Sequence, residues 1–215
     1  MKLKVCGITQ LKQLQQLDEI GVNYAGLIFY EQSARCIINK LGDADVKSLP
    51  LSLKKIGVFV NASEDSIMSN VENYGLDMVQ LHGDETPGFC KIISDQITVS
   101  KAFRITQTNE QNIDWMIKPY EEYCDYYLFD TNRKNAYGGT GEKFDWNLLH
   151  QNKINKPFFL SGGIGVKDVG KLKTFEHPFF YCVDVNSRVE IANGIKDMVA
   201  VKTIADELLD KNIVE

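Results

Sequence analysis

Two residues whose side chains can exchange protons, Cys6 and Asp130, each end a short apolar run of the sequence. A cysteine in such a run is usually a small buried hydrophobic residue, so Cys6 alone does not indicate chemistry. A carboxylate after the run Tyr126–Phe129 is costly to bury unless it is paired or functional. If both side chains met at one substrate, the thiolate could accept a proton and the carboxylic acid could donate one.

A second group of residues has the composition of a phosphate site. Ser161-Gly162-Gly163 follows one apolar run, and Asn186-Ser187 follows the next. Glycine lets the backbone approach an anion closely, and backbone N–H groups can then hold the anion. We therefore expect Gly162, Gly163, Asn186 and Ser187 to bind a phosphate group. The other interpretation is that these glycines only form tight turns.

Further polar residues lie at the ends of other runs or in the loops after them. His82 could be a ligand, a base or a hydrogen-bonded structural histidine, and Asp184 ends the last apolar run. Arg35 lies in the loop after the second run, and Gly139 lies in the glycine-rich loop Gly138–Gly141 after the sixth. The other four cysteines are expected to be structural, and the other two histidines are assigned no role.

Eight short apolar runs, rich in Val, Ile, Phe and Tyr, are candidate strands. They are Lys2–Cys6, Tyr24–Tyr30, Lys55–Asn61, Met78–His82, Thr98–Ile105, Tyr126–Asp130, Pro157–Ser161 and Phe179–Val185. Polar segments with helical spacing lie between them, among them Leu11–Ile20, Glu64–Tyr74, Gln111–Tyr123, Lys167–Thr174 and Lys196–Leu209. Strands that alternate with helices imply βαβ units and a parallel sheet.

Local residues mark several helix ends. Thr9 is expected to cap the first helix, and Ser63 is expected to cap the segment that begins at Glu64. Gly21 and Gly75 stand just past helix ends, where a left-handed backbone conformation is needed.

An α/β fold of the TIM (βα)8-barrel class, with residues 1–215 as a single domain, accommodates eight such units. A chain of 215 residues leaves little room for insertions, so the barrel would be compact. The alternative is an open doubly wound sheet, but no G-x-G-x-x-G follows the first run and no P-loop occurs. No low-complexity segment or linker marks a domain boundary.

Barrel geometry would bring the candidate residues together. The active sites of TIM barrels lie at the C-terminal ends of the strands. Strands six, seven, eight and one are consecutive in a ring of eight, so the first and sixth strands flank a phosphate site after the seventh and eighth. A sugar phosphate bound there would have Cys6 on one side and Asp130 on the other.

Composition and charge argue against several classes of partner. Hydrophobic residues make up 44% of the chain and charged residues 25%, as in ordinary globular proteins, and the net charge is −5. There is no basic patch for nucleic acid or anionic membranes, no signal-peptide pattern and no apolar run of roughly 18 residues. Five widely spaced cysteines without a C-x-x-C pair indicate free thiols and no metal site. We expect a cytoplasmic protein that binds neither nucleic acid nor membrane.

The order of several motifs resembles one known family, the phosphoribosylanthranilate isomerases. The similar segments are Lys4–Thr9 (KVCGIT), Gly57–Asn61 (GVFVN), Val79–Glu85 (VQLHGDE), Phe129–Thr131, Gly138–Gly141, Phe144–Trp146, Leu160–Ile164 and Val183–Glu190, ending near Gly194–Asp197. They are collinear over about residues 2–200. Each motif is weak alone, but other sugar-phosphate barrels do not share the set in this order.

The resemblance implies an Amadori rearrangement in tryptophan biosynthesis, from N-(5-phosphoribosyl)anthranilate to 1-(2-carboxyphenylamino)-1-deoxyribulose 5-phosphate. It implies that Cys6 is the general base, that Asp130 is the general acid and that Arg35 contacts the anthranilate carboxylate. It implies a small-molecule substrate and no cofactor, and a monomer is the default expectation. The candidate substrate-binding residues are then Arg35, His82, Gly139, Gly162, Gly163, Asp184, Asn186 and Ser187.

Two departures from the family pattern concern prolines. Ala34, before Arg35, and Asn193, before Gly194, stand where the family commonly has proline. Loss of a proline loosens a loop but removes no reactive group.

Two alternatives stay open. One is another sugar-phosphate barrel, such as a ribulose-phosphate epimerase with paired aspartates and a metal, or the indole-forming enzyme with a lysine acid and a glutamate. The other is an inactive barrel kept as a binding module, against which the presence of both Cys6 and Asp130 argues.

Overall fold

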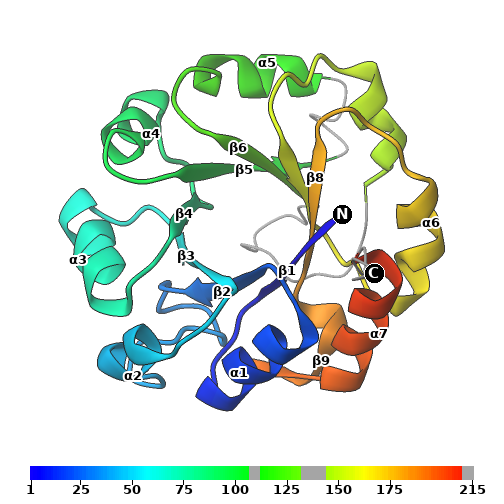
Figure 1. The fold of residues 1–215 in the computed structure, drawn as a ribbon. Coiled ribbons are helices and arrows are strands. Elements are labelled where there is room, and N and C mark those ends of the chain that lie inside the picture. The colour runs from blue at the N-terminus through cyan, green and yellow to red at the C-terminus, as the bar shows by residue number, and fades with distance from the viewer. Residues whose placement is uncertain (107–111, 132–143, 210–215) are drawn as a thin grey trace, which may run out of the picture.

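Eight parallel strands close into a barrel in the order β1 to β8, with β8 paired to β1 (Figure 1). The computed structural model describes residues 1–106, 112–131 and 144–209. The strands are β1 (Lys2–Cys6), β2 (Tyr24–Ile28), β3 (Lys54–Phe59), β4 (Met78–Leu81), β5 (Val99–Ile105), β6 (Tyr126–Thr131), β7 (Phe158–Leu160) and β8 (Phe180–Val185). The expected α/β TIM barrel is confirmed, and each strand falls within two residues of its expected bounds.

Helices surround the barrel and cover its outer face (Figure 1). They are α1 (Leu11–Ile20), α2 (Asp43–Ser48), α3 (Glu64–Tyr74), α4 (Pro87–Ser94), α5 (Ile113–Ile117), α6 (Val169–Thr174) and α7 (Met198–Leu208). The short 3-10 helices within the described residues are η2 (Lys118–Tyr120), η3 (Trp146–Gln151), η4 (Val166–Asp168) and η5 (Ser187–Val189). A small antiparallel pair, β9 (Glu190–Ala192) and β10 (Ile195–Lys196), lies outside the barrel sheet. Among the described residues, no helix is long and apolar enough to cross a membrane.

The helix ends confirm three of the four expected caps and correct one. Ser63 accepts a hydrogen bond from the backbone N–H of Ser66, and Gly21 and Gly75 have the expected left-handed conformation, with φ of 86° and 60°. Thr9 does not cap α1, because the N-cap is Gln10, which makes no side-chain cap. The Thr9 hydroxyl instead donates to the carbonyl oxygen of Gly194 at 2.6 Å, so it ties the β9–β10 hairpin to the first loop.

The barrel interior is filled in layers. One side chain from each of β2 to β8 forms an apolar layer, which consists of Tyr24, Ile56, Met78, Ala102, Leu128, Phe159 and Cys182. Side chains alternate between the two faces of a strand. The residues two positions further along β4, β6 and β8 therefore also face inward, and they are Gln80, Asp130 and Asp184. A polar layer thus lies directly above an apolar one, toward the C-terminal ends of the strands.

Candidate active site

One cavity opens at the C-terminal ends of the strands, where TIM barrels place their active sites. Nine of the ten expected site residues line it, namely Cys6, Arg35, His82, Asp130, Gly162, Gly163, Asp184, Asn186 and Ser187. The tenth, Gly139, lies outside the described residues. The cavity wall also includes Tyr30, Ser33, Gln80, Ser161 and Arg188 together with Ile28, Val58, Val60 and Ile164.

Cys6 ends β1, and its side chain has space because the facing residue of β2 is glycine. Cys6 pairs with Gly26 in the parallel register. A Cβ atom at position 26 would lie 2.6 Å from Cys6 Sγ and 2.9 Å from Cys6 Cα, closer than real contacts allow. The next residue, Gly7, has a φ of 74°, which only glycine adopts readily. These two glycines let the thiol lie at the cavity wall.

The thiol of Cys6 is in a buried environment, because only 5% of the residue is exposed. Burial raises the pKa of the Cys6 thiol, since the thiolate loses hydration. The ammonium groups of Lys4 and Lys196 act in the opposite direction, and the Asp184 carboxylate adds to the rise. The thiol form therefore predominates at neutral pH, with two cations near it that favour the thiolate.

A buried lysine lies beneath Cys6 on the same strand. Lys4 is fully buried, and its Nζ donates to Asp184 Oδ2 at 2.9 Å and to Gln80 Oε1 at 2.7 Å. Burial alone would lower the pKa of Lys4, but the Asp184 carboxylate and the nearby thiols raise it above its usual value. Burial raises the pKa of Asp184, against the effect of Lys4. Lys4 is thus a charged group that joins β1, β4 and β8 across the barrel.

Asp130 extends from β6 into the cavity and faces His82, the first residue after β4. It is 6% exposed, and its Oδ2 lies 3.4 Å from Nε2 of His82. The other ring nitrogen of His82, Nδ1, lies 2.7 Å from Nε2 of Gln80. Gln80, His82 and Asp130 therefore form a continuous row of polar groups from the barrel interior to the cavity.

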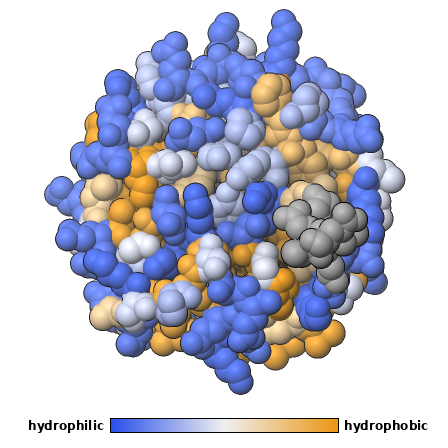
Figure 2. Space-filling view, viewed as in Figure 1, coloured by the Kyte–Doolittle hydropathy of each residue, from blue (hydrophilic) through white to orange (hydrophobic). Residues whose placement is uncertain are grey.

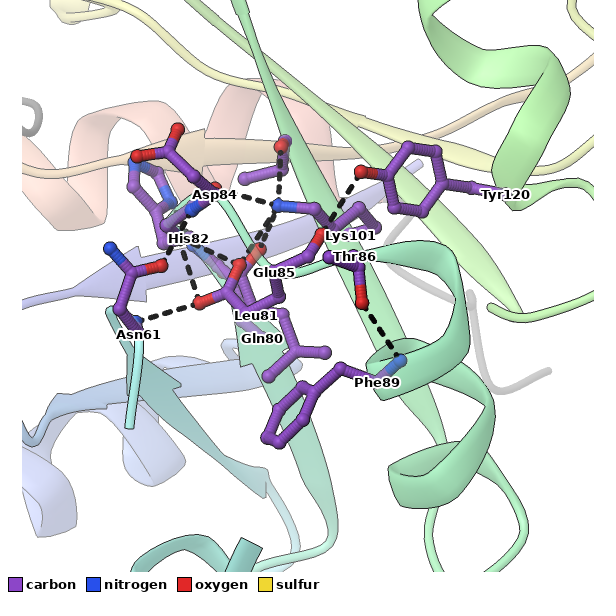
Figure 3. A network of polar contacts seen from close by, with 12 residues as sticks. Asn61, Gln80, Leu81, His82, Asp84, Glu85, Thr86, Phe89, Lys101 and Tyr120 are labelled. Atoms are coloured by element: carbon purple, nitrogen blue, oxygen red, sulfur yellow. Dashed lines mark hydrogen bonds and ion pairs between the residues drawn. The ribbon is translucent and has the colours of Figure 1, made fainter. Parts of the chain in front are cut away.

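The loop that begins at His82 is fixed by a buried ion pair, which Figure 3 shows from close by. Lys101 Nζ lies 2.9 Å from Glu85 Oε2, and both side chains are nearly inaccessible to solvent. The Glu85 carboxylate accepts from the backbone N–H groups of Asn61 and Gly83, while Lys101 donates to the carbonyl oxygen of Gly83 at 2.8 Å. A loop with this many internal bonds holds His82 in one position.

Arg35 reaches the cavity but is paired within the protein. Its Nε and Nη2 donate to the two carboxylate oxygens of Glu190 at 2.6–3.1 Å, and Nη2 also donates to Asn193 Oδ1 at 3.3 Å. The Glu190 hydrogen bonds raise the pKa of Arg35. Glu190 is in turn bound by Lys196, whose Nζ lies 2.6 Å from Glu190 Oε1. Within the described part of the chain, Nη1 of Arg35 makes no hydrogen bond.

The loops after β7 and β8, of which the first is rich in glycine, line the side of the cavity between β6 and β1. Gly162 and Gly163 have φ values of 99° and 66°, so both are left-handed. A side chain at position 162 would also collide with the Thr131 hydroxyl and backbone. After β8, the Asn186 side-chain oxygen accepts from Lys196 Nζ at 2.8 Å, which orients the loop that carries Ser187.

The sequence matches one protein family over nearly its whole length. A family model described as N-(5'phosphoribosyl)anthranilate (PRA) isomerase covers residues 3–207. The chain belongs to the phosphoribosylanthranilate isomerase family. Relatives include the N-(5'-phosphoribosyl)anthranilate isomerases of Parabacteroides distasonis, with 37% identity over 97% of this chain and 94% of the relative, and of Phocaeicola vulgatus, with 36% identity over 98% and 99%.

Solved structures of phosphoribosylanthranilate isomerases have the same fold. A structure of monomers generated from the dimeric Thermotoga maritima enzyme aligns with a TM-score of 0.80 and 31% identity, over 96% of this chain and 97% of that one. An isomerase in complex with reduced 1-(o-carboxyphenylamino)-1-deoxyribulose 5-phosphate aligns with a TM-score of 0.79 and 30% identity, again over 96% and 97%.

Several polar residues of this phosphoribosylanthranilate isomerase site had no expected role from the sequence. Gln80 precedes His82 by two positions on one strand, so strand alternation was a signal that both face inward. Glu190 and Lys196 gave no such signal, because they come from a hairpin of two short strands. Arg188, after the expected phosphate loop, is a further cation at the cavity wall.

Proposed function

We propose that this chain catalyses the isomerisation of N-(5'-phosphoribosyl)anthranilate to 1-(2-carboxyphenylamino)-1-deoxyribulose 5-phosphate in tryptophan biosynthesis. The observation that carries the proposal is that Cys6 and Asp130 line one cavity together with the loops after β7 and β8. Family membership agrees with this chemistry, and the wall of the cavity offers a proton acceptor, a proton donor and an anion site.

The phosphate group of the substrate binds to the loops after β7 and β8. The left-handed Gly162 and Gly163 and the neighbouring Asn186 and Ser187 support this assignment, because glycine backbone can approach an anion closely. A cation, Arg188, lines the same cavity. When the phosphate is bound there, the ribose lies between β6 and β1, within reach of both Asp130 and Cys6.

Asp130 is the general acid of the first step. It gives its proton to the ribose ring oxygen, the C1–O bond breaks, and the nitrogen lone pair forms a C=N bond to C1. Its side chain is almost entirely buried at the cavity wall, where it faces the substrate-binding space.

Cys6 is the general base of the second step. Its thiolate removes the proton from C2, and the electron pair of that C–H bond moves through C1 to the iminium nitrogen, which becomes neutral. The enol formed at C2 then becomes the ketone as C1 takes up a proton and the C2 hydroxyl loses one. The iminium acts as an electron sink, so a base of moderate strength suffices.

Arg35 contacts the carboxylate of the anthranilate ring. Its Nε–Nη2 edge is paired with Glu190, so the substrate carboxylate meets the Nη1 group instead of the complete fork. Glu190 holds the guanidinium in place through this pairing. His82, Asp184 and Gly139 complete the substrate-binding set.

Residues 1–215 form one catalytic domain. The active protein is a monomer, and it is located in the cytoplasm. Buried free cysteines agree with a reducing compartment, since all five lack a disulfide. The Thermotoga maritima relative is described as dimeric, so the oligomeric state of this chain needs its own measurement.

A turnover assay with freshly prepared N-(5'-phosphoribosyl)anthranilate tests the proposed function. The unmodified chain should form the ketose product, detected by mass spectrometry. Cys6→Ser and Asp130→Asn should fold normally but lower kcat by about 10²–10⁴-fold, the usual contribution of a positioned acid or base. Cys124→Ser, a buried cysteine outside the cavity, is the matched control and should retain activity. Absence of turnover by the unmodified chain, or full activity of Cys6→Ser, would contradict the proposal.

A further inference from the structure

Gln80 stands between a buried lysine and the cavity histidine, and its orientation follows from the lysine. Lys4 Nζ lies 2.7 Å from Gln80 Oε1. An ammonium group has only donors, so the glutamine must offer its carbonyl oxygen to Lys4. The amide NH2 group of Gln80 then faces His82, with Nε2 at 2.7 Å from Nδ1 of the ring. Rotating the amide by half a turn would set a donor against the ammonium.

The orientation of Gln80 determines the protonation of His82. A glutamine NH2 group only donates, so Nδ1 of His82 must accept and cannot carry a proton. The neutral ring then carries its proton on Nε2, the nitrogen that lies 3.4 Å from Asp130 Oδ2. An imidazolium would set an N–H group against the NH2 group of Gln80 and would lose this hydrogen bond. One tautomer of the neutral ring therefore satisfies every contact.

The position of the His82 ring is fixed as firmly as its tautomer. The backbone N–H of His82 donates to the carbonyl oxygen of Phe59 at 2.8 Å. The residues that follow are held by the Lys101–Glu85 pair, as Figure 3 shows. The backbone of His82 is thus held by β3 on one side and by its own loop on the other, and Gln80 orients the ring itself.

We propose that Gln80 is a positioning residue, which keeps His82 neutral with its proton on Nε2 and so presents a neutral donor to Asp130. This proposal rests on the assignment of Asp130 as the general acid. A neutral N–H group can orient the carboxyl group, and such contacts often tighten when substrate binds. An imidazolium in the same place would lose the hydrogen bond from Gln80 and would present a positive charge, instead of a neutral donor, to Asp130. Among the charged groups around the ring, Lys4 and Asp184 are paired with each other, and Asp84, two residues after His82, is paired with Arg104.

Nitrogen NMR of the 15N-histidine-labelled chain tests the tautomer without any activity measurement. The chain has three histidines, so the signals of His82 are assigned by their loss in His82→Gln. At neutral pH we expect Nε2 to have the shift of a protonated ring nitrogen and Nδ1 that of an unprotonated one. A ring with the proton on Nδ1, or with both nitrogens protonated, would overturn the proposal. The result is independent of whether the chain turns over the proposed substrate.

Substitution of Gln80 tests the consequence for catalysis. Gln80→Glu keeps the size but offers a carboxylate to Nδ1, so both ring nitrogens should become protonated at neutral pH. We expect kcat to fall by about tenfold or more with KM nearly unchanged, a part of the roughly 10²–10⁴-fold that a positioned acid contributes. Gln80→Met should give a mixture of tautomers and a smaller fall, which covers the case that Gln80→Glu does not fold.

Two further variants separate positioning from a general effect of charge or packing. Gln15→Glu adds the same charge on the exposed face of α1 and should change neither kcat nor the His82 signals. His82→Gln retains a neutral donor and should keep more activity than His82→Ala. If Gln80→Glu protonates the ring but leaves kcat unchanged, or if His82→Gln is no better than His82→Ala, the positioning role is wrong.

Discussion

The proposed base, Cys6, is a thiol whose surroundings oppose its ionisation. Burial raises its pKa, and only the neighbouring Lys4 and Lys196 ammonium groups favour the thiolate. The proposed pair needs a thiolate and a carboxylic acid together, and this active form holds one proton in total. The form with a thiol and a carboxylate also holds one proton, so the two forms interconvert by an internal proton transfer that does not depend on pH.

This proton balance predicts the position of the alkaline limb of kcat/KM. Activity should stay level through neutral pH and fall only when the thiol loses its proton and no proton remains for the acid. Because the pKa of Cys6 is raised, the fall should begin above the ordinary thiol value of about 8.5. A pH profile of kcat/KM measures this, with Cys124→Ser as the reference. If kcat/KM already falls at or below the ordinary thiol pKa, burial does not determine the pKa of Cys6.

Arg35 allows a prediction about substrate recognition. Arg35→Ala should lower kcat/KM for the anthranilate substrate by roughly tenfold to a hundredfold. This range corresponds to the loss of one hydrogen bond to a charged group, which contributes about 1.5–3 kcal/mol. Inhibition by ribose 5-phosphate, which has no ring carboxylate, should be little affected. If that inhibition weakens as much as substrate binding does, Arg35 supports the loop and does not recognise the carboxylate.

At the scale of single elements, strand β2 contributes an empty space to the site. Gly26 faces Cys6, and Gly26→Ala would bring a Cβ atom to 2.6 Å from Sγ. The contact involves a buried strand that cannot move away easily, so we expect lower stability and a large fall in kcat as the thiol is displaced. Thermal unfolding and turnover measure the two effects.

Helical glycines provide the control for this substitution. At Gly88 in α4 and Gly170 in α6, an added Cβ would have no atom within 4 Å apart from the chain neighbours and backbone of its own helix. Alanine at either position should leave kcat unchanged and stabilise the chain by about 0.4–1 kcal/mol, because it restricts the unfolded state. If Gly26→Ala behaves like these two variants, Cys6 does not depend on the space beside it.

The elements also show how far local sequence could predict the fold. The strands were predictable because each is a short, mostly buried apolar run between polar segments, and Ser63 caps α3 as expected. Thr9 was assigned as a cap from its place before a helix, but its hydroxyl bonds to Gly194, far along the chain. The β9–β10 hairpin was missed for a related reason, since its two short strands have little apolar pattern and are held by tertiary contacts.

At the scale of the whole molecule, barrel closure brings distant residues of the chain together. Cys6 and Asp184 come from opposite ends of the sequence, yet Lys4 pairs with Asp184 in the register of β1 and β8. Ring order therefore allowed the grouping of Cys6, Asp130 and the phosphate loops to be predicted. The pairing of Arg35 with Glu190 could not be predicted, because it depends on side-chain contacts between a loop and a hairpin.

The surface predicts that the chain is a monomer. On the face shown in Figure 2, hydrophilic side chains predominate and hydrophobic ones lie in separate small areas. The large hydrophobic residues exposed in the described part of the chain are spread over the fold, namely Ile92, Trp115, Val166, Phe179, Ile191 and Val199. Sedimentation equilibrium should give a mass near 24.4 kDa at all concentrations tested. A mass of twice that value would show a dimer.

The central claim is that Cys6 and Asp130 act on a sugar phosphate held by the loops after β7 and β8. A crystal structure of this chain with reduced 1-(o-carboxyphenylamino)-1-deoxyribulose 5-phosphate, a product analogue, tests this claim most directly. We predict that the phosphate lies on the loops of Gly163 and Ser187. The C2 carbon should lie roughly 3–3.5 Å from Cys6 Sγ, and Asp130 should contact the oxygen that derives from the ribose ring. A phosphate bound elsewhere, or an analogue whose C2 carbon lies beyond the reach of Cys6, would contradict the account.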